Sequence, residues 1–184
     1  LLSADGLEMT FALNHLSYFL LTILLLDRLS ASPSGRIVVV SSHAHENAMM
    51  DFDDLQGEHH YERLKAYGQS KLANLLFAYE LARRLQGASI TVNALTPGAV
   101  ATRLGSNNGW MKANVRNLVY RATGSMVSPE KGADTIIFLA SAPEVQGSTG
   151  GYYRNSKMCP SSNASKDMAV AHRLWDVSQQ LAHV

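Results

Sequence analysis

Residues 36–42 read RIVVVSS, and this stretch decides the fold class. Ile37 to Val40 is an unbroken β-branched run, without the alternation of apolar and polar residues that a half-exposed strand shows. Such a run is typical of a parallel strand that is covered on both faces. Two hydroxyls, Ser41 and Ser42, follow directly. We expect them at the carboxyl end of the strand, where open α/β sheets bind their ligands.

Helical patterns lie on both sides of this strand, and a second buried strand follows. This alternation predicts a doubly wound α/β sheet. About three strands can be counted, whereas a doubly wound nucleotide fold usually has about six. The predicted elements are a helix over 5–29, the strand at 37–40, a long polar loop over 44–60, a helix over 62–85, a strand at 89–95, a helix with Ser128 as its N-cap followed by Pro129 and Glu130, a short strand after Gly150 and a terminal helix over 165–181.

The composition indicates a single globular domain over residues 1–184, with 46% hydrophobic and 17% charged residues. A net charge of +1, without long runs of one sign, gives no sign of a nucleic-acid partner. Cys159 is the only cysteine, which excludes an internal disulfide and favours a reducing compartment, so we expect a cytoplasmic protein. The apolar run from Leu16 to Leu26 is shorter than the ~20 residues of a membrane span. We expect it to be part of a buried core helix, and neither a span nor a signal peptide.

A tyrosine followed by a lysine four residues later occurs three times, at Tyr61–Lys65, Tyr67–Lys71 and Tyr153–Lys157. On a helix such residues share one face, so the ammonium can stabilise a phenolate in a proton-transfer pair. Tyr67–Lys71 lies inside a predicted helix, among small residues that let a flat ligand approach. Tyr61–Lys65 lies at the polar entry of that helix, and Tyr153–Lys157 in a predicted strand and turn. The context favours Tyr67–Lys71, although a half-buried tyrosine beside an exposed lysine stays open as an interpretation.

Three segments resemble the short-chain dehydrogenase/reductase family: RIVVVSS (36–42), AYGQSKLANLLF (66–77) and TVNALTPGAVAT (91–102). DGLEMTFALNHLSYFLLT (5–22), DFDDLQ (51–56) and ELARRL (80–85) narrow the likeness to its retinol-dehydrogenase-like branch, which includes the WW-domain oxidoreductases. The resemblance implies a Rossmann-type doubly wound parallel sheet. It also implies reversible hydride transfer between NADP(H) or NAD(H), with NADP preferred, and an alcohol/carbonyl pair.

The resemblance also implies a set of site residues. The family tyrosine falls on Tyr67, as general acid/base, and the family lysine on Lys71, which would also bond the nicotinamide ribose. The family serine falls on Ser42, which would bond the substrate oxygen. The family asparagine falls on Asn14, which would hold a water linking the lysine to solvent, although the branch more often has glycine at Ser17. The stretch that contacts the nicotinamide corresponds to Pro97, Gly98, Val100 and Thr102.

Each of these residues has a plain structural interpretation as well. Ser42 would cap the following loop, Asn14 would bond only backbone, and Pro97–Gly98 would be a bare turn. The polar loop carries histidines and aspartates, but a His-x-His loop without a rigid scaffold is a weak signal, and we expect no metal site. These loop residues are His43, His45, Asp51, Asp53, Asp54, His59 and His60.

No Gly-x-Gly-x-x-Gly or Gly-x-x-x-x-Gly-Lys turn occurs in the sequence. By the family pattern, the glycine-rich turn and the first four strands lie upstream of Leu1. Residues 1–184 are therefore expected to be the C-terminal portion of the domain. We expect an NAD(P)-dependent oxidoreductase whose 184 residues alone are inactive and, with one edge of the strand 37–40 unpaired, poorly soluble. The alternative is a non-catalytic, truncated or regulatory Rossmann-like protein that no longer binds the dinucleotide.

Two further expectations concern the substrate and the oligomeric state. The segment 105–123 follows Pro97–Gly98 and contains several apolar residues, so we expect it to form a lid over an apolar small-molecule substrate. By the resemblance, the two long helices are expected to support a homodimer.

Overall fold

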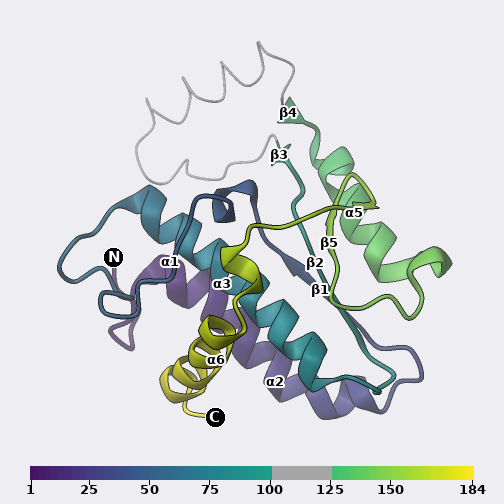
Figure 1. The fold of residues 1–184 in the computed structure, drawn as a ribbon, viewed down its shortest axis with the longest axis horizontal. Coiled ribbons are helices and arrows are strands. Elements are labelled where there is room, and N and C mark those ends of the chain that lie inside the picture. Colours follow the sequence, from purple (N-terminus) through teal and green to yellow (C-terminus); the bar gives the residue numbers. More distant parts are fainter. Residues whose placement is uncertain (101–125) are drawn as a thin grey trace.

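A four-stranded sheet in the order β1-β2-β5-β6 forms the centre of the structure, a computed structural model that describes residues 1–100 and 126–184 (Figure 1). β1, β2 and β5 are parallel, and Val40 of β1 pairs with Leu95 of β2, which pairs with Tyr153 of β5. The predicted parallel sheet is therefore confirmed. The strands are β1 (Arg36–Val40), β2 (Thr91–Leu95), β5 (Tyr152–Arg154) and β6 (Lys157–Met158).

β6 is a strand that the sequence pattern did not predict. It pairs antiparallel with β5 through a tight turn in which Asn155 and Ser156 have positive φ angles of 51° and 58°. Positive φ at both central positions is the usual geometry of a two-residue hairpin, but the sequence signal normally includes glycine. The sequence predicted a turn here, but without that glycine signal it did not predict the return strand β6.

The helices and the short second sheet complete the described part of the chain (Figure 1). β1 and β2 are joined through α3, and β2 and β5 through β3, β4 and α5. These elements are α1 (Met9–Phe11), the π-helix η1 (Ala12–Leu16), α2 (Ser17–Ser30), the 3-10 helix η2 (His43–His45), α3 (Arg63–Arg84), β3 (Ala99–Val100), β4 (Met126–Val127), α5 (Pro129–Ser141), the 3-10 helices η4 (Pro143–Val145) and η5 (Ala164–Lys166), and α6 (Met168–Ala182).

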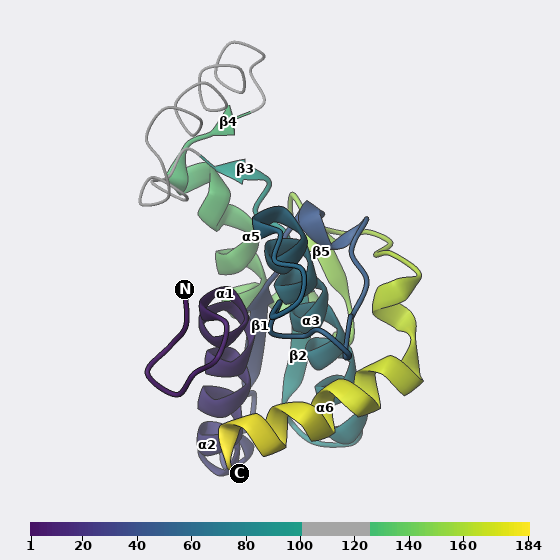
Figure 2. The ribbon, with the colours of Figure 1, turned by 90° about the vertical axis from the view of Figure 1, so that its left-hand side faces the viewer.

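Both faces of the sheet are covered, as the continuous apolar run predicts. On one face, Val39, Val92 and Tyr152 pack in a single cluster with side chains of α2, α3 and α6. On the other face, Leu95 and Tyr153 pack against α5. Figure 2 shows α6 crossing the lower end of the molecule, with the C-terminus beside α2. The strand β1 is at the edge of the sheet among the described residues.

α3 is buried more completely than its leucine stripe predicts. Every residue from Gly68 to Ala78 is buried, whereas the sequence pattern assigned only one stripe of the helix to the core. The sheet, α2 and α6 surround α3 from several sides, and this explains the difference. Polar residues on this helix therefore lie inside the protein, where each needs a partner.

The first helix begins at Met9, four residues later than predicted. Gly6 has a φ of +78°, and the Glu8 carboxylate accepts the backbone N–H groups of Thr10 and Phe11, so Glu8 caps the helix instead of lying in its first turn. The helix contains one π-helical turn, η1, before it continues as α2. Such turns are rare and occur frequently at functional sites.

The helix from Met9 to Ser30 is long and apolar enough to span a membrane, by length and composition only. Phe11, Leu16 and Phe19 are buried, which agrees with a core helix. Leu21 and Leu24 are exposed among the described residues, so the prediction of a buried core helix holds for one face. The prediction that the helix does not cross a membrane remains a prediction.

Candidate active site

Tyr67 and Lys71 lie in α3, one turn apart, and their side chains are close. The Nζ atom of Lys71 is 5.8 Å from the centre of the Tyr67 ring, and Lys71 is only 8% exposed. The interpretation of Lys71 as an exposed charge is therefore wrong. Lys71 Nζ donates one long hydrogen bond, 3.4 Å, to the carbonyl oxygen of Val40. Burial lowers the pKa of this ammonium, because charge is less stable away from water.

The other two tyrosine–lysine pairs are separated by the structure. Tyr61 precedes α3, and its hydroxyl donates to Glu8 at 3.4 Å, whereas Lys65 binds Asp51 at 3.0 Å. Tyr153 is buried beneath α5, while Lys157 lies on the exposed strand β6. Neither of these pairs combines a tyrosine and a lysine on one helical face.

The carboxyl end of β1 is tied to the middle of α3. Ser41 Oγ donates to the carbonyl oxygen of Lys71 at 2.7 Å, so Ser41 has a structural role. The carbonyl oxygen of Val40 accepts from both Lys71 Nζ and Asn74 Nδ2, the latter at 3.2 Å. These bonds hold Lys71 beside the strand end that carries Ser42.

Ser42 is half-buried and begins the turn that leads into η2. Its Oγ accepts the backbone N–H of Ala44 at 3.3 Å, so the loop-capping interpretation describes one real contact. A glycine in α3 brings this turn close to Tyr67, because a Cβ at Gly68 would lie 3.0 Å from the carbonyl oxygen of Ala44. The sequence reasoning noted only the small size of Gly68 and missed this contact.

Asn14 lies in the π-helical turn η1 and points toward α3. Its Nδ2 donates to Ser70 Oγ at 3.0 Å, and Ser70 Oγ donates to the carbonyl oxygen of Tyr67 at 2.8 Å. The interpretation of Asn14 as a residue bonded only to backbone is therefore wrong. One short chain of hydrogen bonds connects Asn14 to the turn of α3 that carries Tyr67.

The residues after β2 extend the same end of the sheet (Figure 1). Pro97 and Gly98 follow β2 directly, and Gly98 has a φ of +79°, a conformation that favours glycine. Val100, in β3, packs against α5, where a Cβ at Gly132 would lie 2.6 Å from a Val100 methyl group. Thr102 and the predicted lid 105–123 lie outside the described residues. Ser42 and Pro97 thus follow adjacent parallel strands, the usual ligand-binding end of such a sheet.

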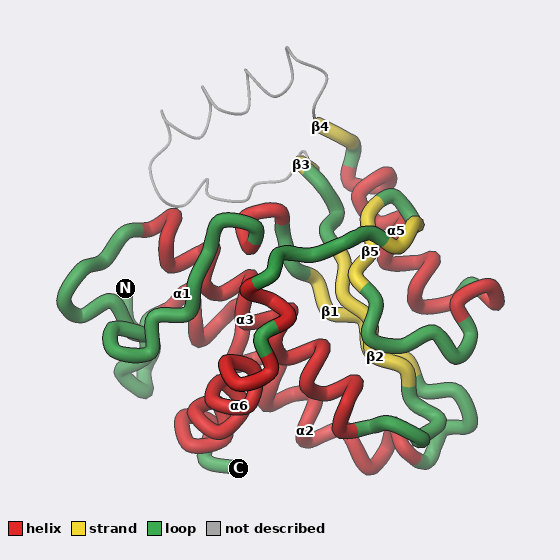
Figure 3. The backbone as a smooth tube through the Cα atoms, in the orientation of Figure 1, coloured by secondary structure: helices red, strands yellow, loops and turns green. Residues whose placement is uncertain are grey.

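The histidine and aspartate loop between η2 and α3 forms contacts within itself and with the N-terminal segment (Figure 3). Asp54 accepts the backbone N–H groups of His59 and His60, and His43 pairs with Glu46. Over residues 1–100 and 126–184, no cluster of three His, Cys, Asp or Glu side chains has the arrangement of a metal site.

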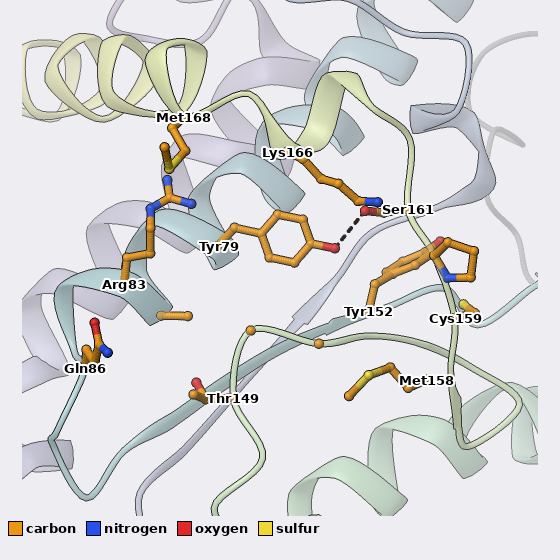
Figure 4. Close-up of a pocket in the computed structure, with 14 residues that line it drawn as sticks. Tyr79, Arg83, Gln86, Thr149, Tyr152, Met158, Cys159, Ser161, Lys166 and Met168 are labelled. Atoms are coloured by element: carbon orange, nitrogen blue, oxygen red, sulfur yellow. Dashed lines mark hydrogen bonds between the residues drawn. The ribbon is translucent and has the colours of Figure 1, made fainter.

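A groove of about 600 Å³ lies away from this site, between the C-terminal half of α3 and the β5–β6 hairpin (Figure 4). The hydroxyls of Tyr79 and Ser161 are bonded across it at 2.8 Å. None of the predicted site residues that the structure describes lines the groove, so it is separate from the described part of the candidate active site.

Comparison with known proteins gives a consistent result. The family model described as short chain dehydrogenase matches residues 1–113. Human retinol dehydrogenase 14 is 46% identical over 177 residues, which cover 95% of this chain and 52% of that protein. Human retinol dehydrogenase 13 is 43% identical, over 96% of this chain and 54% of that protein. The chloroplastic short-chain dehydrogenase TIC 32 B of Brassica napus is 38% identical, over 98% of this chain and 58% of that protein.

Solved structures agree on the fold. An uncharacterized protein from Mycobacterium paratuberculosis matches with a TM-score of 0.76 and 32% identity, over 100% of this chain and 62% of that one. A protein assigned as an NAD(P)-dependent gluconate 5-dehydrogenase, from Beutenbergia cavernae and solved with NADP at low occupancy, matches with a TM-score of 0.60 and 25% identity, over 79% of this chain and 53% of that one. The chain spans about half the length of the curated relatives it matches.

Proposed function

Because the chain belongs to the short-chain dehydrogenase family, we propose that it supplies the catalytic side chains of an NAD(P)-dependent oxidoreductase that interconverts an alcohol and a carbonyl compound. The observation that carries this proposal is the pairing of Tyr67 with the buried Lys71 beside the strand end that bears Ser42. Family likeness alone would not distinguish an enzyme from an inactive relative. A buried cation next to a phenol is costly to maintain, which supports retention of chemistry.

Tyr67 is the proposed general acid/base, because oxidation of an alcohol requires removal of its hydroxyl proton. The ammonium of Lys71 stabilises negative charge on the phenol oxygen. Ser42 donates a hydrogen bond to the substrate oxygen and fixes its direction. Asn14 supports this arrangement through Ser70, which bonds the backbone of Tyr67.

The described residues fit a nicotinamide dinucleotide. Lys71 Nζ has three donors, and among residues 1–100 and 126–184 it makes a single long bond, to Val40, so donors remain for ribose hydroxyls. Gly98 provides a segment without a side chain beside β2, where a flat ring can approach, and Pro97 and Val100 flank it. When bound, the dinucleotide supplies or accepts the hydride. We prefer NADP to NAD, and the structural relative solved with NADP supports this choice.

The substrate that we propose is an apolar alcohol or the corresponding carbonyl compound. Relatives named retinol dehydrogenase, 38–46% identical to this chain, support an apolar substrate class. The expected cytoplasmic location and a homodimer formed through the long helices are also part of the proposal. The exposed leucines of α2 support a further contact of that helix, with a second copy, with more of the polypeptide or with a membrane.

The test of the proposed function is replacement of Tyr67 in the complete natural polypeptide that carries these residues. We expect Tyr67→Phe to lower kcat by at least ~100-fold, the scale of lost general acid/base catalysis. Tyr61→Phe is the matched control, since Tyr61 precedes the same helix and its hydroxyl bonds Glu8. This variant is expected to stay within ~2-fold of wild type. Wild-type turnover by Tyr67→Phe would reject the assignment.

The alternative, a non-catalytic relative without dinucleotide binding, requires a separate measurement. Calorimetry with NADP(H) on the complete natural polypeptide distinguishes the two functions. Binding that is weakened when Lys71 is replaced by Met supports the oxidoreductase, because Lys71 is the proposed ribose ligand. No binding at millimolar cofactor supports the alternative.

A further inference from the structure

His45 is a fully buried histidine that lies three residues after Ser42 and bonds through both ring nitrogens. Its Nδ1 is 2.6 Å from the carbonyl oxygen of Ser42, and its Nε2 is 3.3 Å from the backbone nitrogen of Ser162. A carbonyl oxygen only accepts and a backbone N–H only donates. The proton therefore lies on Nδ1, and Nε2 is the acceptor. One neutral tautomer satisfies both bonds.

The surroundings of His45 hold the ring in this neutral form. Burial lowers the pKa of His45, although the bond to Ser42 and the charge of Glu46 act in the opposite direction. The ring lies edge-on to Tyr152 of β5, with 5.2 Å between ring centres. His45 is thus fixed from three directions, by the end of β1, by β5 and by the segment between β6 and η5.

The peptide group after Ser42 is held by His45 twice. Its carbonyl oxygen accepts from the ring Nδ1 at 2.6 Å and from the backbone N–H of His45 at 3.2 Å. The side chain of Ser42, in contrast, makes one weak hydrogen bond to the described residues, from the N–H of Ala44 at 3.3 Å. The position of the serine hydroxyl consequently depends on the backbone that His45 holds.

The segment that Ser162 belongs to is itself anchored. Ser161 Oγ is bonded to Tyr79 of α3 at 2.8 Å (Figure 4). It also receives a bond from Ser165 Oγ at 2.8 Å. The bond between His45 and Ser162 thereby joins two residues that are 117 positions apart in the sequence. An apolar side chain would pack equally well against Tyr152, but it would leave the N–H of Ser162 and one bond to Ser42 unmatched.

We propose that His45 is a positioning residue for Ser42, which transmits the fixed position of the C-terminal segment at Ser162 to the strand end that carries the serine hydroxyl. The inference rests on the proposed function, because it assigns a purpose to the placement of Ser42. Nothing in this role requires His45 to touch the substrate or the cofactor.

Two substitutions of His45 separate hydrogen bonding from packing. His45→Phe keeps a ring against Tyr152 and removes both side-chain bonds. His45→Asn keeps a donor near the place of Nδ1, toward the Ser42 carbonyl oxygen, but gives up the ring. His43→Phe is the control, since His43 is partly exposed and pairs with Glu46.

In the complete natural polypeptide, we expect His45→Phe to lower kcat by ~10-fold or more, because small displacements of a reacting group cost at least this much. The KM for the cofactor should stay within ~2-fold, since Ser42 is not among the proposed cofactor contacts. His45→Asn should have a kcat close to that of wild type, even if it melts at a lower temperature than His45→Phe. His43→Phe should match wild type.

The inference is overturned if His45→Phe keeps wild-type kcat, or if kcat in the two variants follows melting temperature, because His45 would then be a packing residue only. Tyr67→Phe, assayed in parallel, keeps this result distinct from the proposed function. An active Tyr67→Phe enzyme rejects the proposed function, whereas an inactive Tyr67→Phe with an active His45→Phe rejects only the role of His45.

Discussion

The carboxylate of Glu80 in α3 lies 3.0 Å from Nδ1 of His172 in α6, and this contact joins two helices that are far apart in the sequence. Glu80 is 1% exposed and also binds Arg83 and Arg84 of its own helix. Arg84 in turn lies 4.1 Å above the ring of Trp175, so the same cluster fixes α6 by charge and by packing.

Removal of the Glu80 charge should loosen α6. Glu80→Gln is expected to lower the free energy of unfolding by roughly 1–3 kcal/mol, the range for lost hydrogen bonds to a charged group. Chemical denaturation at pH 7 measures this, with Glu144→Gln, an exposed position in η4, as the control. Equal stability of the two variants would show that the cluster contributes nothing.

The same carboxylate predicts a dependence on pH. Burial raises the pKa of Glu80, but the hydrogen bonds from Arg83 and Arg84 outweigh it, and the net pKa lies below the ordinary value. Its contribution to stability is therefore complete above the unfolded pKa, near 4.5, and is lost as pH falls through the lower folded pKa. In the Glu80→Gln variant, the free energy of unfolding should therefore decrease less steeply than in wild type as the pH falls below 4.5.

Lys71 should be required for activity but not for stability. In the described part of the chain its buried ammonium has a single long hydrogen bond, so an apolar side chain of similar length is better tolerated in that place. We expect Lys71→Met to lose turnover while its free energy of unfolding is unchanged or higher by on the order of 1 kcal/mol. Thermal melting and an activity assay of the same sample measure both.

The control for Lys71 is Lys65→Met, which removes an exposed ion pair to Asp51 that solvent screens. Both its activity and its melting temperature should stay close to wild type. A large loss of stability in Lys71→Met would mean that this lysine serves the fold.

His15 should contribute to unfolding in weak acid. Burial lowers its pKa to about 4, while the neighbouring Asn74 side chain acts in the opposite direction. Because the unfolded chain takes up the proton near pH 6.5 and the folded chain does not, stability decreases as pH falls from 6.5 toward about 4. The total loss is roughly 3 kcal/mol.

The His15→Gln variant tests this directly. Glutamine can still donate to Ser178 Oγ, as His15 Nε2 does over 2.9 Å, but it does not titrate. The slope of the unfolding free energy between pH 4 and 6.5 should be shallower in the variant. An unchanged slope would show that other groups cause the acid sensitivity.

The sequence predicted those features that depend on neighbouring residues. The β-branched run predicted β1 and the burial of the sheet on both faces. The i, i+4 spacing predicted that Tyr67 and Lys71 share one face of α3. Ser128 was correctly predicted as the cap of α5, because the cap, the proline and the acid occur side by side. Local patterns of this kind need no knowledge of the remaining chain.

Features that depend on distant contacts could not be predicted in this way. The burial of Lys71 follows from the layers around α3, and the bond from His45 to Ser162 joins two loops that no spacing rule relates. The π-helical turn that aims Asn14 at Ser70 has no sequence signature. The turn between β5 and β6 contains a serine with left-handed backbone conformation. Glycine at such a position is the usual sequence signal for a hairpin.

The position of Trp175 has a consequence for genetics. Its ring lies 5.0 Å from Phe19 and 6.0 Å from Phe77, at the centre of the cluster beneath the sheet. A nonsense allele that ended translation before Met168 would keep every proposed catalytic side chain. It would remove α6, however, and so expose the rings of Phe19 and Phe77. In a screen for null alleles, such late stop codons should reduce activity as severely as mutations in the codon for Tyr67. They should be recognised by low protein abundance.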